Sequence, residues 1–279
     1  MRTNRKLWFV AIVAVLLACM AVTVDAKVKK GKKKKDVIVC THKCPLVKDT
    51  SGKAKNLTFT VNGVKFEMVP VDGGSYKTQK CDEYDPTEEK TVVLKSYYIG
   101  QTEVTQALWT AVMGDNPSRY KNDKYPVMTV SFDNCQVFLN KLNELTGKNF
   151  RLPSVVEWQF AASGGNKSKG YIYAGSNDLN KVAWYENNSD GKLHVVATKA
   201  ANELGIYDMS GNVFEWCSDY DNGIRSTSPD IGPGLAAPTA YYCGGSWLFP
   251  PKHNEIKYKE SARAFDKNDN VGLRLALDK

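Results

Sequence analysis

Alternating apolar and polar positions predict the first strands of the chain. Between Phe59 and Val71 apolar residues recur at every second position on either side of Asn62-Gly63. This dipeptide between alternating segments is typical of a β-hairpin turn. Gly73-Gly74 is expected to end the second strand, and Thr91 to Ile99 is predicted to form a further strand.

Three later segments show the spacing of apolar residues that amphipathic helices require. The first spans Thr102 to Met113 and the second spans about Ser131 to Leu145, and each is followed closely by a glycine that can end a helix. The third begins at Ser154-Val155-Val156-Glu157, which has the spacing of a capping box. Beyond Gly164-Gly165 this regular periodicity fades, and the remainder is rich in Gly, Asn, Asp and aromatic residues. Such irregular stretches in a compact domain are typical of functional loops or bound ions.

The N-terminus has the pattern of an export signal, with a short basic region before an apolar run from Leu7 to Val24. The run is short for a membrane anchor, so we expect a signal peptide at residues 1–26 that is removed. Leu16-Leu17-Ala18-Cys19 is a second possibility, because it resembles a bacterial lipobox in which Cys19 would be acylated. Whether the signal peptide is simply removed or Cys19 is acylated, we expect the mature protein to leave the cytoplasm.

The charge is concentrated in one segment of the chain. The formal net charge is +8, yet residues 27–35 alone hold seven Lys, and residues 36–279 hold 28 basic and 29 acidic side chains. A nearly neutral body argues against a nucleic-acid partner, which needs clustered basic residues on the folded domain. We interpret residues 27–57 as a Lys-rich leader and linker, with one short strand at Val37 to Cys40. The Lys27 to Lys35 run is either a solvated spacer or a means of adhering to anionic envelope surfaces.

Export permits disulfides, and six cysteines remain after removal of the signal. The three histidines lie far apart, and Cys40-x3-Cys44 has no second ligand pair after it, so a zinc or His-rich metal centre is not predicted. Residues 58–279 are interpreted as one domain without internal repeats.

Several short sequence motifs, called strings below, show a resemblance to a known family that hydrophobic periodicity does not reveal. Read in order along the chain, they resemble the sulfatase-modifying factor family, that of the formylglycine-generating enzyme. The resemblance implies an α+β fold with little regular secondary structure, related to the C-type lectin fold. The strings are Phe66-Glu67-Met68-Val69-Pro70-Val71-Asp72-Gly73-Gly74, Glu103-Val104-Thr105, Asn116-Pro117-Ser118, Arg151-Leu152-Pro153-Ser154, Gly205-Ile206-Tyr207-Asp208-Met209-Ser210-Gly211-Asn212-Val213-Phe214-Glu215-Trp216, Gly244-Gly245-Ser246-Trp247 and Gly272-Leu273-Arg274.

The chain departs from the family at the catalytic positions. Catalytic members oxidise a sulfatase cysteine to formylglycine with copper(I) held by two cysteines, and the matching positions here are Phe249 and Asn254. Copper(I) prefers thiolate ligands, so copper is not expected at this site. Cys217 and Cys243 lie elsewhere, and we interpret them as buried thiols or a disulfide rather than a relocated metal site.

The resemblance also implies a calcium site in the string that starts at Asp208. Calcium prefers several oxygen ligands, and irregular backbone can supply carbonyl oxygens at close spacing. Carboxylates would come from Asp208 and Glu215, and main-chain carbonyls from Gly211 and Val213. The alternative is that the two carboxylates only hydrogen-bond to turn amides.

We therefore expect an exported, non-catalytic domain, stabilised by calcium, that binds an envelope protein or glycan in the periplasm or outer envelope of a bacterium. The alternatives are a copper-dependent formylglycine-generating oxidase and a structural component of an envelope assembly. Membrane association through Cys19 or through the Lys run is also possible. The residues expected to line the cleft are Ser246, Trp247, Phe249, Asn254 and Arg263. The aromatic residues Trp184, Tyr185, Trp247 and Phe249 are either surface or core residues.

Overall fold

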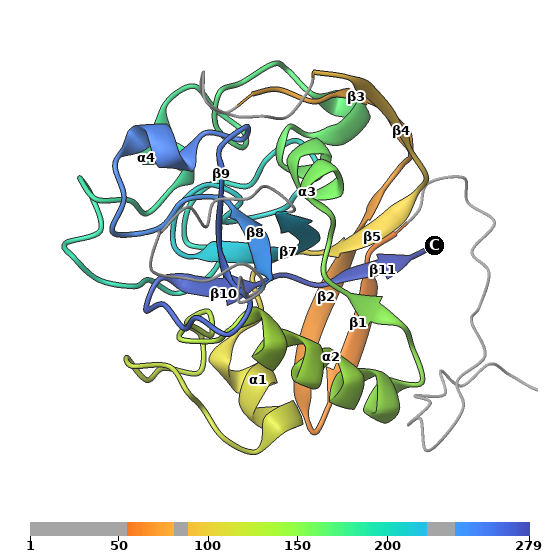
Figure 1. Ribbon diagram of the computed structural model, residues 1–279, viewed down its shortest axis with the longest axis vertical. Coiled ribbons are helices and arrows are strands. Elements are labelled where there is room, and N and C mark those ends of the chain that lie inside the picture. Colours follow the sequence, from red (N-terminus) through yellow and green to blue (C-terminus); the bar gives the residue numbers. More distant parts are fainter. Residues whose placement is uncertain (1–54, 81–88, 222–237) are drawn as a thin grey trace, which may run out of the picture. The chain divides into compact units, whose positions relative to one another are not determined.

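The computed structural model describes residues 55–80, 89–221 and 238–279, all within the compact unit Leu46–Lys279 (Figure 1). Cys19, the Lys27 to Lys35 run and the predicted strand at Val37 to Cys40 lie outside the described residues. Within the described part, no helix is both long and apolar enough to span a bilayer.

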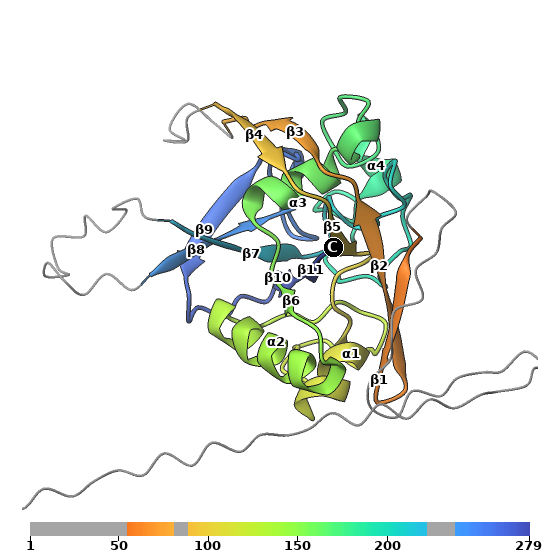
Figure 2. The same ribbon diagram turned by 90° about the vertical axis from the view of Figure 1, so that its right-hand side faces the viewer.

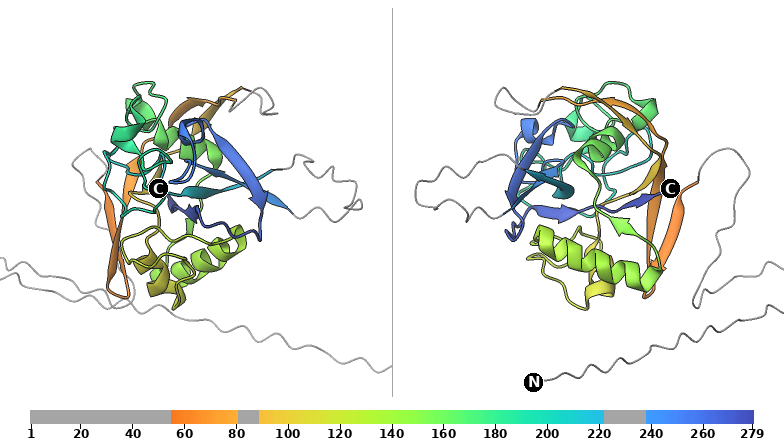
Figure 3. Two further views of the ribbon diagram at one scale, coloured as in Figure 1. Left: turned by 90° about the vertical axis from the view of Figure 1, so that its left-hand side faces the viewer. Right: turned by 45° about the vertical axis from the view of Figure 1, so that its right-hand side comes forward.

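The first sheet is built around the predicted hairpin, which is confirmed. Strands β1 (Leu57–Val61) and β2 (Val64–Val71) pair antiparallel, and Asn62 and Gly63 have φ values of 46° and 84°, as a type I′ turn requires. The sheet has the order β1-β2-β5-β11-β6, with β5 (Tyr97–Gly100), β11 (Ala276–Asp278) and β6 (Phe150–Arg151). Figure 3 shows that the C-terminal strand β11 thereby runs back beside the N-terminal strands.

The single strand predicted from Thr91 to Ile99 is wrong, because the structure divides it between two sheets. Strand β4 (Thr91–Leu94) pairs with β3 (Gly74–Lys77), whereas the residues after Ser96 join the first sheet as β5. Gly73 marks the crossing point: its amide donates to the Ser96 hydroxyl at 2.9 Å, and a side chain there would collide with the Leu94 carbonyl. The Gly73-Gly74 pair ends β2, as predicted, and directs the chain into the two-stranded sheet of β3 and β4.

All three predicted helices are present. Helix α1 (Gln106–Met113) begins later than predicted because Thr105 is its N-cap, while Val104 donates its amide to Leu273 instead. Helix α2 (Phe132–Thr146) has Ser131 as N-cap, and α3 (Val155–Ala162) has the predicted Ser154 capping box. The Trp109 and Phe138 rings stack at 4.9 Å and hold α1 against α2. Shorter turns are η1 (Gly165–Lys167), α4 (Leu179–Val182) and η2 (Pro251–Asn254).

A second sheet lies in the part of the chain where no regular elements were predicted. Its order is β10-β7-β8-β9, from β10 (Val271–Leu273), β7 (Phe214–Asp221), β8 (Thr239–Cys243) and β9 (Lys259–Arg263). Helix α3 packs against β7 and β8 (Figure 2). The start of β7 could not be recognised by alternation, because Phe214 to Cys217 are all fully buried. The architecture is the predicted α+β mixture.

Candidate functional site

The loop from Gly244 to η2 contains four of the five predicted cleft residues. Gly244 and Gly245 turn the chain with φ values of +103° and +74°, and a side chain on Gly245 would collide with the Asn254 amide. The loop therefore folds closely onto the residue that ends η2. Only glycine tolerates both a positive φ and the lack of space for a side chain. The Gly-Gly pair therefore determines the direction of the loop that follows it.

The Asn254 side chain lies inside this loop and stabilises it by hydrogen bonds. It is fully buried, and its amide donates to the carbonyl oxygens of Phe249 at 3.2 Å and Pro250 at 2.9 Å. The Phe249 ring packs against Phe214 at 5.2 Å and against His253 at 5.0 Å. Asn254 thus closes the loop on itself, and Phe249 fixes the loop to β7.

Ser246 and Trp247 are core residues of the loop rather than open cleft residues. Ser246 is fully buried, and Trp247 is 5% exposed and packs with Met128, Leu193 and Val213. Tyr185 is likewise buried, and Trp184 is stacked on His194 at 3.7 Å between ring centroids.

Arg263 does not join the loop residues. On β9 it pairs with Thr239, four positions along the strand from the Lys259–Cys243 pair that lies beside the loop. Its guanidinium forms an ion pair with Asp266 at 3.1 Å and lies over the Phe265 ring. At about 3.3 Å per strand residue, it is more than 10 Å along the sheet from Cys243.

Exposed side chains lie beside Trp247 on one edge of the loop. The Tyr120 ring meets Trp247 edge-on at 6.4 Å and is 41% exposed, and Leu248 is 46% exposed. Arg119 lies over the Tyr120 ring at 5.5 Å and forms an ion pair with Asp269 at 3.1 Å. We call Arg119, Tyr120, Leu248 and Asp269 the aromatic rim.

A buried ion pair lies where β7 meets β10. Glu215 and Arg274 are both fully buried, and the Arg274 guanidinium donates to both carboxylate oxygens, at 2.6 to 3.0 Å. Trp158 donates its indole N–H to the same carboxylate at 2.6 Å. The remaining Arg274 donors reach the carbonyl oxygens of Gly100 and Tyr207, both at 2.9 Å. This arginine therefore ties the first sheet, the second sheet and the preceding loop together.

Two further carboxylates adjoin this ion pair. Burial raises the pKa of Asp208 to about 6, although the Ala197 amide donates to it at 2.6 Å. Burial, with the nearby Asp208 and Glu215 charges, raises the pKa of Glu103 well above its usual range. Glu103 accepts from the Asn212 amide at 3.1 Å and from the Val213 N–H at 3.2 Å. Of these three carboxylates, only Glu215 is hydrogen-bonded to Arg274, and burial of the other two favours a bound proton on them.

Comparison with known proteins identifies the family of this chain. Residues 58–279 match the family described as the sulfatase-modifying factor enzyme 1-like domain. The chain belongs to the sulfatase-modifying factor family. The predicted resemblance is confirmed.

Similar proteins include both named enzymes and proteins with other names. The chaperone protein LppX of Paenibacillus barcinonensis is 33% identical over 77% of this chain and 91% of its own length. The formylglycine-generating enzyme of Streptomyces coelicolor is 29% identical over 63% of this chain and 60% of its own length. Among solved structures, the Treponema denticola variable protein 1 matches with a TM-score of 0.72 and 28% identity, over 81% of this chain and all of that one. The fold is therefore shared by family members with different names.

The family's copper donors have no counterpart in the loop. Phe249 offers a hydrocarbon ring, and the Asn254 amide is already engaged with two carbonyl oxygens. Neither supplies the thiolate that copper(I) prefers, so the residues present do not fit copper.

The predicted calcium residues fit a hard cation only in part. Asp208 is 3% exposed and, with Gly211 and Val213, lies in the turn before β7. Glu215, however, is already bound by Arg274, which would have to share or release its oxygens. Among the described residues no group of three His, Cys, Asp or Glu side chains could hold a metal ion, so main-chain oxygens would have to complete the shell. The calcium site stays a prediction.

Cys217 and Cys243 are neighbours on β7 and β8. Both are fully buried free thiols in the structure, and burial together with the Cys243 thiol raises the pKa of Cys217. Low exposure and a raised pKa make an inert thiol rather than a reactive one. A disulfide between them stays a prediction for the oxidised protein.

The roles of Glu103 and Arg274 were missed in the sequence, although both lie in the strings that resemble the family. Their positions are 171 residues apart in the chain, and only the pairing of β10 with β7 brings Arg274 to Glu215. A buried arginine next to three acidic residues leaves no local pattern. The one signal in the sequence was their place in the motifs Glu103-Val104-Thr105 and Gly272-Leu273-Arg274, which resemble the family.

Proposed function

We propose that this chain is an exported, non-catalytic member of the sulfatase-modifying factor family that binds a protein partner in a bacterial envelope. The observation that carries the proposal is the use of Asn254 and Phe249 as structural supports of the loop. The Phe249 ring has no donor atom, and the Asn254 NH2 group is used by the loop, so neither residue supplies the thiolate that copper(I) prefers. The scaffold of an oxidase is thus retained without its donors.

The same supports give the loop a surface suited to binding. The Gly244-Gly245 turn leads into Trp247, whose amide donates to the Asn212 carbonyl at 2.9 Å and whose buried ring contacts the exposed Tyr120 ring. The exposed Leu248 follows Trp247 in the chain. Tyrosine and arginine are enriched among residues that dominate protein interfaces, and a rigid support lowers the entropy lost on binding. We infer that the aromatic rim is the contact surface.

A protein partner is favoured over other classes for two reasons. The chaperone protein LppX is similar over almost its whole length, and its name denotes action on proteins. The rim also combines apolar area with one Arg–Asp pair, as protein interfaces do.

Export and calcium complete the proposal. The signal-like segment at residues 1–26 would send the protein out of the cytoplasm, and Cys19 or the Lys27 to Lys35 run would hold it near the membrane. Calcium at Asp208 would neutralise charge in the carboxylate cluster beside Arg274.

The test is site-specific crosslinking in envelope extracts. A photo-reactive residue at position 248 should capture specific proteins, and Tyr120→Ala should abolish that capture. The matched control carries the photo-reactive residue at Val93, an exposed apolar position on β4 with 79% exposure. Capture of the same proteins from both positions, or capture that Tyr120→Ala does not change, would contradict the proposed surface.

An oxidase function is less well supported. The similarity to the Streptomyces coelicolor enzyme favours it, but the thiols in the second sheet are Cys217 and Cys243, both fully buried. A substrate thiol and oxygen would have no access to a metal held there. A purely structural role in an envelope assembly would give crosslinks that do not depend on Tyr120.

A further inference from the structure

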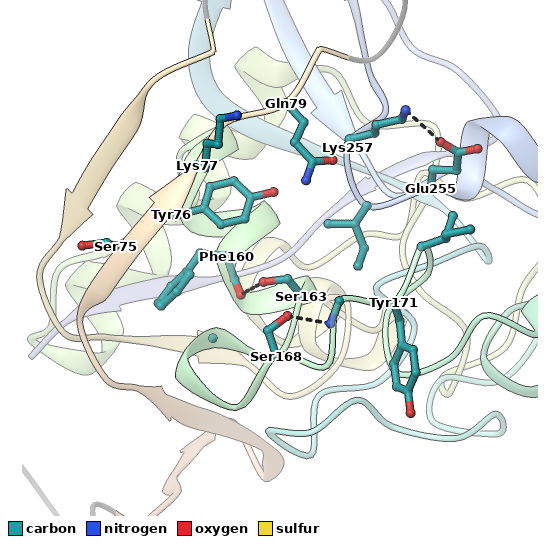
Figure 4. A pocket seen from close by; sticks show the side chains of 14 residues that line it. Ser75, Tyr76, Lys77, Gln79, Phe160, Ser163, Ser168, Tyr171, Glu255 and Lys257 are labelled. Atoms are coloured by element: carbon teal, nitrogen blue, oxygen red, sulfur yellow. Dashed lines mark hydrogen bonds and ion pairs between the residues drawn. The ribbon is translucent and has the colours of Figure 1, made fainter.

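A second candidate site lies away from the aromatic rim. A cavity of about 440 Å³ opens between β3, the end of α3, the 168–172 loop and the segment after η2 (Figure 4). This volume lies in the range of about 300–1,000 Å³ typical of small-ligand sites. The residues that matter for its chemistry are Tyr76, Gln79, Phe160, Ile172, Ile256 and Lys257.

One wall of the cavity is apolar and firmly held. The Phe160 ring meets the Tyr76 ring edge-on, with centroids 6.1 Å apart and planes at 67°. On the other side the Ile256 amide donates to the Ile172 carbonyl at 3.0 Å, which fastens these two side chains at the cavity. Aromatic and branched aliphatic side chains thus both line the cavity.

Two polar groups at the cavity have no hydrogen-bond partner within the described residues. They are the Tyr76 hydroxyl, which points into the cavity, and the Gln79 amide above it (Figure 4). The Tyr76 hydroxyl is protonated at neutral pH, since burial raises its pKa above the usual value. A phenol can donate and accept, and an amide can do the same, so both suit a ligand with hydroxyl groups.

The charged groups at the cavity are already paired. Lys77 forms an ion pair with Glu89 at 3.1 Å, and Lys257 forms one with Glu255 at 3.6 Å. Among the described residues, the cavity therefore offers no unmatched cation for an anion and no unmatched carboxylate for a cation. Charge balance favours a neutral ligand.

We propose that this cavity binds a neutral sugar ring. A pyranose has hydroxyl groups along its edge for Tyr76 and Gln79, and it has C–H faces for the aromatic and isoleucine walls. A purely apolar ligand would cover the two polar groups without satisfying them, which is costly. The cavity and the aromatic rim share no residues. The proposal of sugar binding is therefore tested separately from that of a protein partner.

The test is saturation-transfer NMR on the full chain with glucose, galactose and N-acetylglucosamine, each added alone at millimolar concentration. At least one sugar should show transfer. Tyr76→Phe removes one hydroxyl and keeps the ring, and it should weaken that binding about fivefold to tenfold, the effect of one lost hydrogen bond. Ile172→Trp, at a position that is 52% exposed, should fill the cavity and abolish binding.

Tyr171→Phe is the matched control, because Tyr171 lines the same cavity but its hydroxyl points away from it (Figure 4). Its affinity should equal that of the wild-type protein. The proposal would be overturned if none of the three sugars showed saturation transfer with the wild-type protein. So would equal affinities for Tyr76→Phe and Tyr171→Phe, or binding that survives Ile172→Trp.

Discussion

Replacing Arg274 by Met should destabilise the protein more than any loss of a surface charge. The guanidinium is fully buried and donates to both oxygens of Glu215 and to the carbonyls of Gly100 and Tyr207. Methionine keeps much of the volume but none of the donors. Glu215 would then be a buried carboxylate with only the Trp158 N–H as a partner outside the ion pair.

The expected loss is about 3–5 kcal/mol, the usual cost of removing one partner from a buried ion pair. A domain of this size unfolds with about 5–15 kcal/mol in total, so the variant should be only marginally folded. Arg263→Met is the matched control, because Arg263 forms an exposed ion pair with Asp266. Exposed pairs contribute about 0–1 kcal/mol.

Urea unfolding followed by tryptophan fluorescence measures both losses, since Trp158 and Trp216 are fully buried. The double variant Glu215→Met with Arg274→Met should recover part of the lost stability, because it removes the stranded carboxylate along with its partner. A loss below about 1 kcal/mol for Arg274→Met, or one no larger than that of Arg263→Met, would refute the assigned role.

Other parts of the structure give three more expected outcomes. Burial opposes ionisation of Glu157, but hydrogen bonds from Arg151 and the helix cap hold its pKa below the ordinary 4.5, so its stabilisation is present above that pH and is lost as the pH falls. Glu157→Gln should lower the unfolding free energy at pH 7 by about 1–2 kcal/mol and flatten the acid limb of a stability–pH curve, whereas an unchanged limb would contradict this. Calcium at a hundredfold excess over its dissociation constant should stabilise the wild-type protein by about 2.7 kcal/mol, and melting curves of Asp208→Ala should show no calcium response. Gly245→Ala should cost more than Gly114→Ala in the same assay, because both have positive φ but only Gly245 lacks space for a side chain; equal losses would count against the packing of the loop.

The sequence was most informative where local rules determine the structure. The Asn62-Gly63 turn and the Ser154 to Glu157 capping box each need only neighbouring residues, and both are present. Alternation failed for β7, because Phe214 to Cys217 are buried on both faces of the sheet. Fully buried strands lose the polar positions that would reveal their period.

The sequence predicted which single residues of the site are replaced, but not the contacts that these residues make. Phe249 and Asn254 could be recognised as replacements for cysteines, but their supporting contacts depend on how the loop folds onto η2. The sequence leaves Trp247 as either a surface or a core aromatic, and the packing of Met128 and Leu193 around it shows that it belongs to the core. The Tyr76 cavity has no sequence signal, because four separate segments meet there.

The central claim is that this fold is retained without formylglycine chemistry. The most direct measurement is mass spectrometry of a cysteine-containing sulfatase peptide incubated with the purified protein after loading with copper under reducing conditions. We predict that the peptide keeps its cysteine mass, because Phe249 and Asn254 supply no thiolate for copper(I). Conversion of the cysteine to formylglycine that stops when copper is removed would contradict the account.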